Sequence, residues 1–340
     1  MRERRPLMMP TQEEIRQAAD LLEAGELVAF PTETVYGLGG DAENPQAVAA
    51  IYAAKGRPAD HPVIVHLAPG ADPGYWSDAI GPAARALIDA FWPGPLTLIL
   101  KRAPHIHPAV SGGQDSVGLR CPSHPVAQAL LRAFKQGRGG VAAPSANRFG
   151  RVSPTTAQHV RDEFEGLPGV KVHVLDGGAT PVGIESTILD LSRGFPALLR
   201  PGHITPEQIA EVIGEVPRMP QTDSDAPRAS GTLKAHYAPR TPLFLFDAPA
   251  LPAALSVRRP GERVAVAAFE ATLATVHGDG ILAVQLPAEP AALASALYAL
   301  LRQLDAAGVS HILFERLPAR PEWAAVDDRL QRAAAAFSAD

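Results

Sequence analysis

Short apolar runs recur through the first part of the chain and constrain its fold more than any other feature. They are bounded by Gly, Pro and polar residues, as buried strands usually are, and they cover residues 27–30, 62–67, 96–100, 117–119, 141–143, 172–175 and 188–191. Helical patterns separate them: Thr11 and Glu14 form a capping box ahead of a helix that ends at Gly25, and residues 45–55 are Ala-rich. The pattern predicts a mixed α/β domain with many strands.

A stretch without any period divides the chain. A helix predicted at 206–213 ends at Gly214, and residues 215–240 then contain Pro, Ser, Gly and Asp without helical or strand spacing. Beyond this linker, apolar runs alternate with helical patterns, which predicts a small parallel sheet of Rossmann-like type. These runs cover 243–246, 263–268, 281–286 and 311–315, and the longest helical pattern covers 290–307. We therefore expect a first domain over 1–214, a linker or lid over 215–240 and a second domain over 241–340. No Gly-x-Gly-x-x-Gly follows the second domain's first strand, so no dinucleotide site is expected there.

Charge and cysteine content exclude several classes of protein. The net charge of -5 gives no overall basic field for non-specific nucleic-acid binding. The single cysteine, Cys121, excludes an intramolecular disulfide framework and a Cys-rich zinc site, and we expect it to be an inert core residue. The basic N-terminus lacks the apolar core of a signal peptide, and no apolar run is long enough to span a bilayer. The sequence predicts a cytoplasmic protein with no membrane partner and no strong direct binding to nucleic acid.

Polar side chains interrupt or end several of the apolar runs. Residues 30–38 read Phe-Pro-Thr-Glu-Thr-Val-Tyr-Gly-Leu, so hydroxyls and a carboxylate follow a strand, although a polar turn with capping hydroxyls explains the same residues. Lys55 and Arg57 flank a glycine at a helix end, where complementing the helix dipole is an alternative role. His61 follows them. His66 lies inside an apolar run, where a hydrogen-bonded core histidine is the alternative to a ligand-binding one.

Three further segments also place polar side chains at the beginning or end of an apolar run. Arg120 ends a run that follows Ser116, and its planar fork suits a carboxylate or phosphate, although a surface ion pair would also explain it. Residues 142–148, Ala-Ala-Pro-Ser-Ala-Asn-Arg, place Ser and Asn after a strand, with an ordinary Ser-initiated loop as the alternative. Residues 183–188 lead from a polar stretch into a strand, and Arg200 follows the next apolar pair.

These signals favour one pocket when they are taken together. Five strand ends present hydroxyls, amides or arginines, and a shared site explains this better than independent turns do. Arginine and lysine together with Ser and Asn suit the binding of anions. The sequence has no Walker A loop, no His-Glu-x-x-His, no Gly-x-Ser-x-Gly and no protein-kinase motif set. From the residues alone, the prediction stops at an enzyme that binds a polyanion.

The ordered motifs resemble those of the threonylcarbamoyl-AMP synthases. They comprise Pro31-Thr-Glu-Thr-Val-Tyr-Gly-Leu, Lys55-Gly-Arg-Pro, residues 62–66, Trp92-Pro-Gly-Pro-Leu-Thr, Val117-Gly-Leu-Arg-Cys-Pro, Ala143-Pro-Ser-Ala-Asn, Glu185-Ser-Thr-Ile and Leu199-Arg-Pro-Gly. The resemblance covers essentially the whole chain, because the long form of that family adds a linker with His-Tyr-Ala-Pro, here residues 236–239, and a second Rossmann-like domain. It implies a YrdC-like first domain, in which helices accompany a mixed, twisted open sheet.

The resemblance also implies a reaction. In that family, L-threonine, bicarbonate or CO₂, and ATP give threonylcarbamoyl-adenylate and pyrophosphate, with Mg²⁺ accompanying ATP. The product passes to a tRNA threonylcarbamoyl transferase, which modifies an adenosine in tRNA. One alternative is a non-catalytic RNA-binding or ribosome-associated module, which the acidic net charge disfavours. Another is a carbamoyl transferase that acts through carbamoyl-adenylate, whose zinc fingers a chain with one cysteine lacks.

Residue by residue, the resemblance implies three groups of site residues. The L-threonine subsite would contain Thr34, His66, Arg120, Ala143 and Ser186. ATP would be bound by Arg57, His61, Ser116, Ser145, Ser153, Arg200 and His236. Lys55, Arg57 and Asn147 would form the catalytic signatures near the phosphates. No metal site made of protein side chains is expected, since Mg²⁺ would come with ATP.

Overall fold

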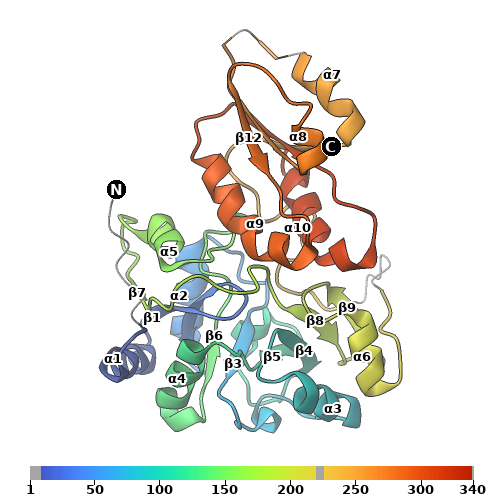
Figure 1. Cartoon of the computed structure of the whole chain (residues 1–340). Helices are drawn as coiled ribbons and strands as arrows, with labels where there is room; N and C mark the ends of the chain where they lie inside the picture. The colour runs from blue at the N-terminus through green and yellow to red at the C-terminus, as the bar shows by residue number, and fades with distance from the viewer. Residues whose placement is uncertain (1–8, 220–225, 257, 260, 339–340) are drawn as a thin grey trace. The chain divides into compact units, whose positions relative to one another are not determined.

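The computed structural model describes residues 9–219, 226–256, 258–259 and 261–338, which form two compact units (Figure 1). The first unit lies within Met1–Phe149 and Ser153–Thr232, and the second within Gly150–Val152 and Leu233–Asp340. The division after Thr232 falls inside the linker predicted over 215–240, of which residues 220–225 lie outside the described part of the chain. None of the helices in the described ranges is long and apolar enough to cross a membrane.

The first unit is built on a nine-stranded mixed sheet in the order β7-β1-β2-β6-β3-β5-β4-β8-β9. Its strands are β1 (Leu27–Pro31), β2 (Tyr36–Asp41), β3 (Ile64–Leu67), β4 (Leu96–Lys101), β5 (Ser116–Arg120), β6 (Gly140–Ala142), β7 (Val172–Val174), β8 (Thr187–Asp190) and β9 (Ala197–Arg200). The pairs β1–β7, β3–β5 and β4–β8 are parallel and the other pairs are antiparallel. The predicted mixed α/β fold is confirmed, and β2 and β9 are strands that the apolar runs did not predict.

The sequence of β2 explains why it was not predicted. It reads Tyr-Gly-Leu-Gly-Gly-Asp, and glycine inside a strand usually weakens it. In this strand, close packing against neighbouring atoms leaves no room for a side chain. A Cβ atom at Gly39 would lie 2.8 Å from the Phe30 ring and 2.9 Å from the Val28 carbonyl oxygen. Only a residue without a side chain lets β2 pack this closely against β1.

In the described part of the first unit, six α-helices accompany the sheet. They are α1 (Gln12–Glu23), α2 (Pro45–Lys55), α3 (Pro82–Phe91), α4 (Pro125–Ala133), α5 (Ala157–Phe164) and α6 (Pro206–Ile213), with short 3₁₀ turns η1 (Pro73–Tyr75), η2 (Pro108–Ser111) and η3 (Phe134–Gly137). The predicted capping box is present, because Thr11 Oγ1 accepts from the Glu14 amide at 3.2 Å and Glu14 Oε2 accepts from the Thr11 amide at 2.7 Å. Gly56 ends α2 in the left-handed conformation, which turns the chain sharply after Lys55.

The two faces of this sheet are covered differently. One face carries the larger core, which includes Leu98, Val117, Leu119 and Leu189. On the other face, α1 and α4 pack together over β1 and β6 (Figure 1). Farther along that face, an apolar patch formed by Ile64, Ile99, Ile188 and Leu199 packs against Ala226 and Ala229. We call residues 226–232 the covering segment, because Ala226 and Ala229 of this segment pack on the patch.

The second unit holds a four-stranded parallel sheet in the order β10-β13-β11-β12, as predicted. Its strands are β10 (Leu243–Phe246), β11 (Val264–Ala268), β12 (Ile281–Gln285) and β13 (His311–Glu315). Its helices are α7 (Leu251–Ser256), α8 (Glu270–Leu273), α9 (Pro290–Asp305) and α10 (Ala324–Ala335), with 3₁₀ turns η4 (Ala248–Ala250) and η5 (Pro321–Trp323). The core of this unit includes Phe246, Val266 and Leu313, one residue from each of three strands.

Candidate active site

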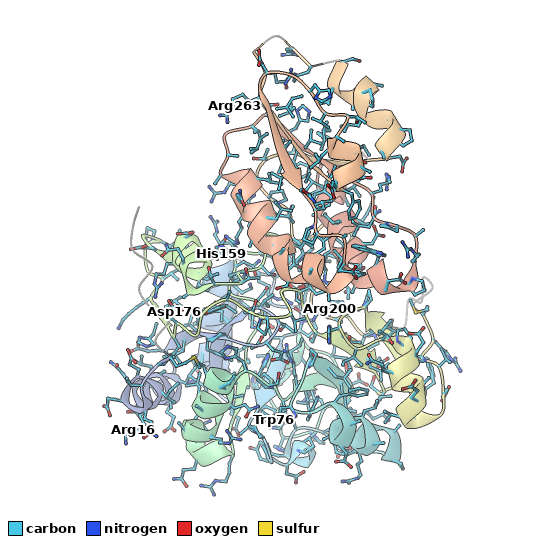
Figure 2. All side chains as sticks on the ribbon, in the orientation of Figure 1. Arg16, Trp76, His159, Asp176, Arg200 and Arg263 are labelled. Carbon is cyan, nitrogen blue, oxygen red and sulfur yellow. The ribbon has the colours of Figure 1, made fainter. Side chains whose placement is uncertain are left out.

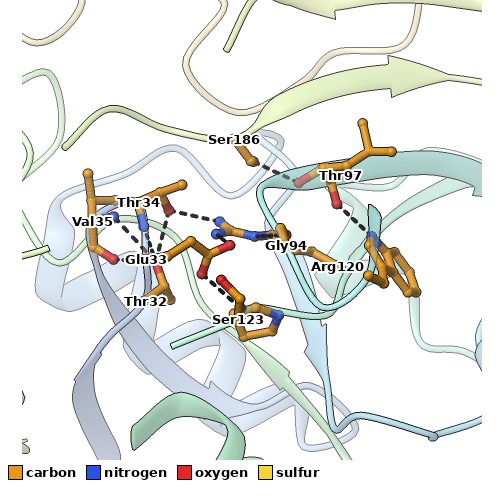
Figure 3. Close-up of polar contacts among 12 residues, drawn as sticks. Thr32, Glu33, Thr34, Val35, Gly94, Thr97, Arg120, Ser123 and Ser186 are labelled. Carbon is orange, nitrogen blue, oxygen red and sulfur yellow. Dashed lines mark hydrogen bonds and ion pairs between the residues drawn. The ribbon is translucent and has the colours of Figure 1, made fainter. Parts of the chain in front are cut away.

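Arg120 is the centre of a buried polar cluster in the first unit (Figure 3). It is the last residue of β5 and is 4% exposed. Its Nη1 donates to Thr34 Oγ1 at 3.0 Å, and its Nε donates to the Gly94 carbonyl oxygen at 3.4 Å. Its Nη2 lies 2.7 Å from Glu33 Oε1. A guanidinium fixed in this way suits a carboxylate or phosphate ligand, because its planar fork can donate two parallel hydrogen bonds.

The turn between β1 and β2 brings Thr34 to this cluster. Thr32 Oγ1 donates to the Val35 carbonyl oxygen at 2.7 Å and lies 2.8 Å from Thr34 Oγ1. The Thr34 and Val35 amides donate to Thr32 Oγ1 at 3.2 and 3.3 Å. The Thr32 hydroxyl therefore stabilises a polar turn, which agrees with the alternative interpretation of residues 30–38. The same turn places Thr34 against Arg120, so the two interpretations are compatible.

The predicted residues gather across one face of the sheet rather than only at strand ends. Side chains alternate along a strand, so Ser116, Gly118 and Arg120 of β5 share a face. The β3–β5 register pairs Ile64 with Gly118 and His66 with Arg120. This is the face that carries the apolar patch. Ser116 begins β5 and Arg120 ends it. Strand ends and alternation along the strands therefore both place predicted residues on this face, and the expectation of one shared pocket stays a prediction.

Ser186 and Arg200 form a second buried cluster on this face. Ser186 Oγ lies 2.8 Å from Thr97 Oγ1 and accepts from Arg200 Nη2 at 3.2 Å. Arg200, labelled in Figure 2, is 2% exposed and its Nε donates to the Ser186 carbonyl oxygen at 3.0 Å. Its Nη1 donates to the Ser230 carbonyl oxygen at 2.7 Å. Arg200 thus joins a predicted threonine-subsite serine to the covering segment.

Arg57 contacts the same part of the covering segment. Its Nη2 donates to the Pro62 carbonyl oxygen at 2.8 Å and lies 3.5 Å from Ser230 Oγ. The Phe149 ring lies 5.7 Å from the Arg57 guanidinium and 5.4 Å from the His61 ring, centroid to centroid. The two arginines predicted to bind ATP therefore meet at Ser230, although they are far apart in sequence.

Lys55 has a different environment from the one expected of a residue that contacts phosphates. It is 2% exposed, and its Nζ donates to the carbonyl oxygens of Ser145 and Asn147, both at 2.5 Å. Burial, followed by the nearby charge of Arg57, lowers the pKa of Lys55 well below its ordinary value. Lys55 therefore fixes the loop after β6, which includes the predicted residues Ser145 and Asn147. Its predicted catalytic role stays a prediction.

His66 is a buried histidine beside Arg120 in the sheet register. It is 3% exposed, its Nδ1 lies 3.3 Å from the Ile64 carbonyl oxygen, and its ring stands edge-on to Phe30 at 6.2 Å. Burial, with a smaller contribution from the charge of Arg120, lowers the pKa of His66 from 6.5 to about 3. His66 is therefore neutral near pH 7.

This pKa predicts how stability depends on acidity. As pH falls from 6.5 toward about 3, the unfolded chain protonates His66 and the folded chain does not, so the free energy of unfolding decreases. The slope is up to about 1.4 kcal/mol per pH unit. We expect His66→Gln to show a shallower loss of stability than the parent between about pH 6.5 and 5, measured by urea unfolding. His203→Gln, which changes an exposed histidine, is the control. Equal slopes for the parent and His66→Gln would contradict the prediction.

The remaining predicted residues divide between the two units. In the first unit, Ser153 Oγ donates to Glu185 Oε1 at 2.6 Å, and the Ala143 amide donates to the Ile64 carbonyl oxygen at 3.0 Å. His236 belongs to the second unit, where its amide donates to the Arg332 carbonyl oxygen at 3.1 Å. Its neighbour Tyr237 stacks on Tyr298 in that unit at 5.6 Å. The contact predicted between His236 and ATP therefore stays a prediction.

Three residues of this face were not among the predicted site residues, although two of them lie in the quoted motifs: Glu33, Thr97 and Gln114. Gln114 Oε1 accepts from the Arg228 amide at 2.7 Å and its Nε2 donates to the Arg228 carbonyl oxygen at 3.1 Å, so it anchors the covering segment. The carboxylate of Glu33, between the threonines of residues 31–38, was one sequence signal available. Thr97 ends the motif Trp92-Pro-Gly-Pro-Leu-Thr, whereas nothing in the spacing of Gln114 distinguishes it from an ordinary polar residue.

Two protein families match consecutive parts of the sequence. A family described as "Telomere recombination" matches residues 20–202. A family described as "Threonylcarbamoyl-AMP synthase, C-terminal domain" matches residues 204–335. Together they extend over both units of the structure.

Curated and solved proteins match over nearly the full length. A threonylcarbamoyl-AMP synthase of Bacillus subtilis (strain 168) is 41% identical over 333 residues, which cover 94% of this chain and 93% of that protein. A threonylcarbamoyl-AMP synthase of Pyrococcus abyssi is 37% identical over 333 residues, with the same two coverages of 94% and 93%. The crystal structure of P. abyssi Sua5 complexed with L-threonine has a TM-score of 0.84 and 35% identity, and covers 97% of this chain and 96% of that one.

Proposed function

Because this chain belongs to the threonylcarbamoyl-AMP synthase family, we propose that it makes threonylcarbamoyl-AMP on the sheet face that carries Arg120 and Arg200. The activity is that of the family, which serves the threonylcarbamoyl modification of tRNA. What carries the assignment to this face is the pair of buried arginine clusters, one around Arg120 and one that joins Arg57 and Arg200 at Ser230.

Arg120 is proposed to bind the carboxylate of L-threonine. The related P. abyssi protein was solved as a complex with L-threonine, which supports an amino-acid subsite in this fold. Thr34 contacts Arg120, and His66 lies beside Arg120 in the sheet register. Ser186 and Ala143 complete the proposed subsite. Neutral His66 can supply a hydrogen-bonding ring without adding charge.

ATP is proposed to lie along Arg57 and Arg200. Guanidinium groups neutralise phosphate oxygens, and their burial strengthens the interaction because water does not compete. His61, Ser116, Ser145, Ser153 and His236 are the other proposed contacts. Lys55 and Asn147 would act on the loop that presents Ser145. Mg²⁺ is proposed to enter with ATP as part of the substrate, since Mg²⁺ is commonly held by phosphates and waters with one or two carboxylates.

The proposed chemistry needs no protein nucleophile. The threonine amine combines with bicarbonate to give a carbamate and water, and a carbamate oxygen then attacks the α-phosphorus of ATP. The bond to the β-phosphate oxygen breaks and pyrophosphate leaves. The protein's task is to align the two substrates and to stabilise the charge on the leaving group.

A direct test is the release of pyrophosphate from ATP by the purified full chain. We propose that release requires both L-threonine and bicarbonate, and that the nucleotide product is threonylcarbamoyl-AMP by mass spectrometry. Pyrophosphate release that is independent of threonine would contradict the proposal. The product would then pass to a tRNA threonylcarbamoyl transferase.

The covering segment is proposed to act as the lid of this site. A carbamate and a mixed anhydride decompose in water, so the site needs a cover during the reaction. The segment already contacts Arg57 and Arg200 through Ser230, and Gln114 holds Arg228. Phosphates bound by the same arginines would add contacts on the segment's inner side and hold it in place.

Limited proteolysis tests the lid. Trypsin cleaves after Arg228, whose side chain is 53% exposed. With ATP and L-threonine together, we expect this cleavage to slow on the order of fivefold, because ligands that stabilise the closed segment reduce its opening. Gln114→Ala, which removes both hydrogen bonds to the Arg228 backbone, should cleave faster in every condition. Faster cleavage of the parent with ligands would mean that ATP displaces the segment.

A further inference from the structure

Glu33 is a buried carboxylate for which the reaction described above has no use. It is 5% exposed and lies in the turn between β1 and β2. Its Oε2 accepts from the Ser123 amide at 3.0 Å, and its backbone carbonyl accepts from the Val182 amide at 2.8 Å. Two separate loops therefore fix Glu33. Its Oε1 lies 2.7 Å from Arg120 Nη2 (Figure 3).

The contact between Glu33 and Arg120 has an unusual geometry. The two atoms are close, but neither Glu33 Oε1 nor Arg120 Nη2 has an aligned hydrogen bond within the described part of the chain. Both atoms are fully enclosed. Buried polar groups normally make their hydrogen bonds, and an exception in a protein calls for a specific reason. The charges of this pair balance each other, while the guanidinium keeps hydrogen-bonding capacity at Nη2.

We propose that Glu33 is a positioning residue that holds the Arg120 guanidinium in place for the carboxylate of the amino-acid substrate. This rests on the threonine subsite proposed above. A buried guanidinium without a counter-charge is costly and would turn toward the nearest carbonyl oxygens or water. Thr34 and Gly94 fix two of its nitrogens, and Glu33 supplies the charge that keeps the third enclosed.

A purely structural ion pair is the competing explanation, and substrate kinetics separate the two. An ion pair that only stabilises the fold would affect thermal stability and leave the threonine KM of the folded enzyme unchanged. A positioning residue affects the substrate whose contact it orients. If Glu33 is a positioning residue, its substitution should change the KM for threonine and leave the KM for ATP unchanged.

The test uses the full chain with three substitutions. Glu33→Gln keeps the size of the side chain and an oxygen for the Ser123 amide but removes the charge; we expect the threonine KM, and its Kd by calorimetry, to rise about tenfold with the ATP KM within about twofold. Glu33→Asp keeps the charge and should recover part of the threonine affinity. Asp41→Asn is the matched control. It breaks an ion pair of the same length, 2.7 Å to Lys135 Nζ, in the same unit, and should not change the threonine KM.

Several outcomes would overturn the inference. Unchanged or tighter threonine binding by folded Glu33→Gln would show that Glu33 has no positioning role, and so would an equal rise in the KM for ATP. The double variant Glu33→Gln/Arg120→Ala must bind threonine no more weakly than Arg120→Ala, because Glu33 acts through Arg120. If Arg120→Ala itself binds threonine normally, the proposed subsite is wrong and this inference falls with it. If Arg120→Ala fails and the Glu33 variants bind normally, only the inference is wrong.

Discussion

Arg120→Ala is expected to lower threonine-dependent pyrophosphate release about a hundredfold or more, with most of the effect in the KM for threonine. The guanidinium is 4% exposed, so no water can replace its contact with a substrate carboxylate cheaply. The substitution also leaves Glu33 buried without its counter-charge. Steady-state kinetics with threonine varied at saturating ATP measure the effect. Unchanged kinetic constants would remove Arg120 from the site.

Two further variants separate binding from folding in this experiment. Arg120→Lys keeps a positive charge but loses the planar fork, and it should recover only part of the threonine affinity. Arg120→Ala/Glu33→Gln removes the stranded charge and should melt at a higher temperature than Arg120→Ala. If the double variant regains both stability and threonine binding, the loss in Arg120→Ala came from folding.

Arg200→Ala is expected to reduce kcat/KM for ATP about a hundredfold. Arg200 donates to the Ser186 carbonyl oxygen, to Ser186 Oγ and to the Ser230 carbonyl oxygen. Its loss removes a proposed phosphate ligand and a contact that holds the covering segment. Kinetics with ATP varied, together with trypsin cleavage after Arg228, should show both effects in one variant.

Arg193→Ala provides the matched control for Arg200→Ala. Arg193 lies between β8 and β9, and its Nε lies 2.7 Å from Asp190 Oδ2. Its guanidinium also lies 4.9 Å from the centre of the Phe195 ring. Loss of Arg193 should lower stability, because Asp190 is buried and loses its counter-charge, and should leave the KM for ATP unchanged. If Arg193→Ala impairs ATP use as strongly as Arg200→Ala, the defect belongs to the β8–β9 hairpin and not to a phosphate contact.

The fold could be predicted where local pattern and tertiary packing agree. Strands β10 and β13 and helix α6 have the bounds that their apolar spacing predicted. Strand β2 could not be predicted, because its glycines are required by contacts with β1 and not by strand propensity. Helix α10 was also missed, although its buried Val326 and Leu330 lie four residues apart. Its Ala-rich, charged sequence gives a weak apolar stripe.

The candidate site was predictable as a set of residues but not as an arrangement. Motif residues such as Arg57 and Arg200 were identified and residues 215–240 were expected to form a linker or lid, but no spacing predicted that both arginines contact Ser230. The family resemblance implied that Lys55 lies near phosphates, whereas its hydrogen bonds to two backbone carbonyls depend on the fold and not on any local pattern. The motif around Glu33 does not indicate its partners, because Arg120 belongs to β5 and Ser123 to the loop after β5.

The apolar patch beneath the covering segment links the solubility of the protein to its turnover. Ile64, Ile99, Ile188 and Leu199 lie on the face of the sheet proposed to bind the substrates, and Ala226 and Ala229 pack against them. Exposed aliphatic patches promote self-association. The lid proposed above would therefore expose an aggregation-prone surface each time it opens. We therefore expect substitutions in residues 226–232 to change solubility and turnover together, which couples the two properties in evolution and in engineering.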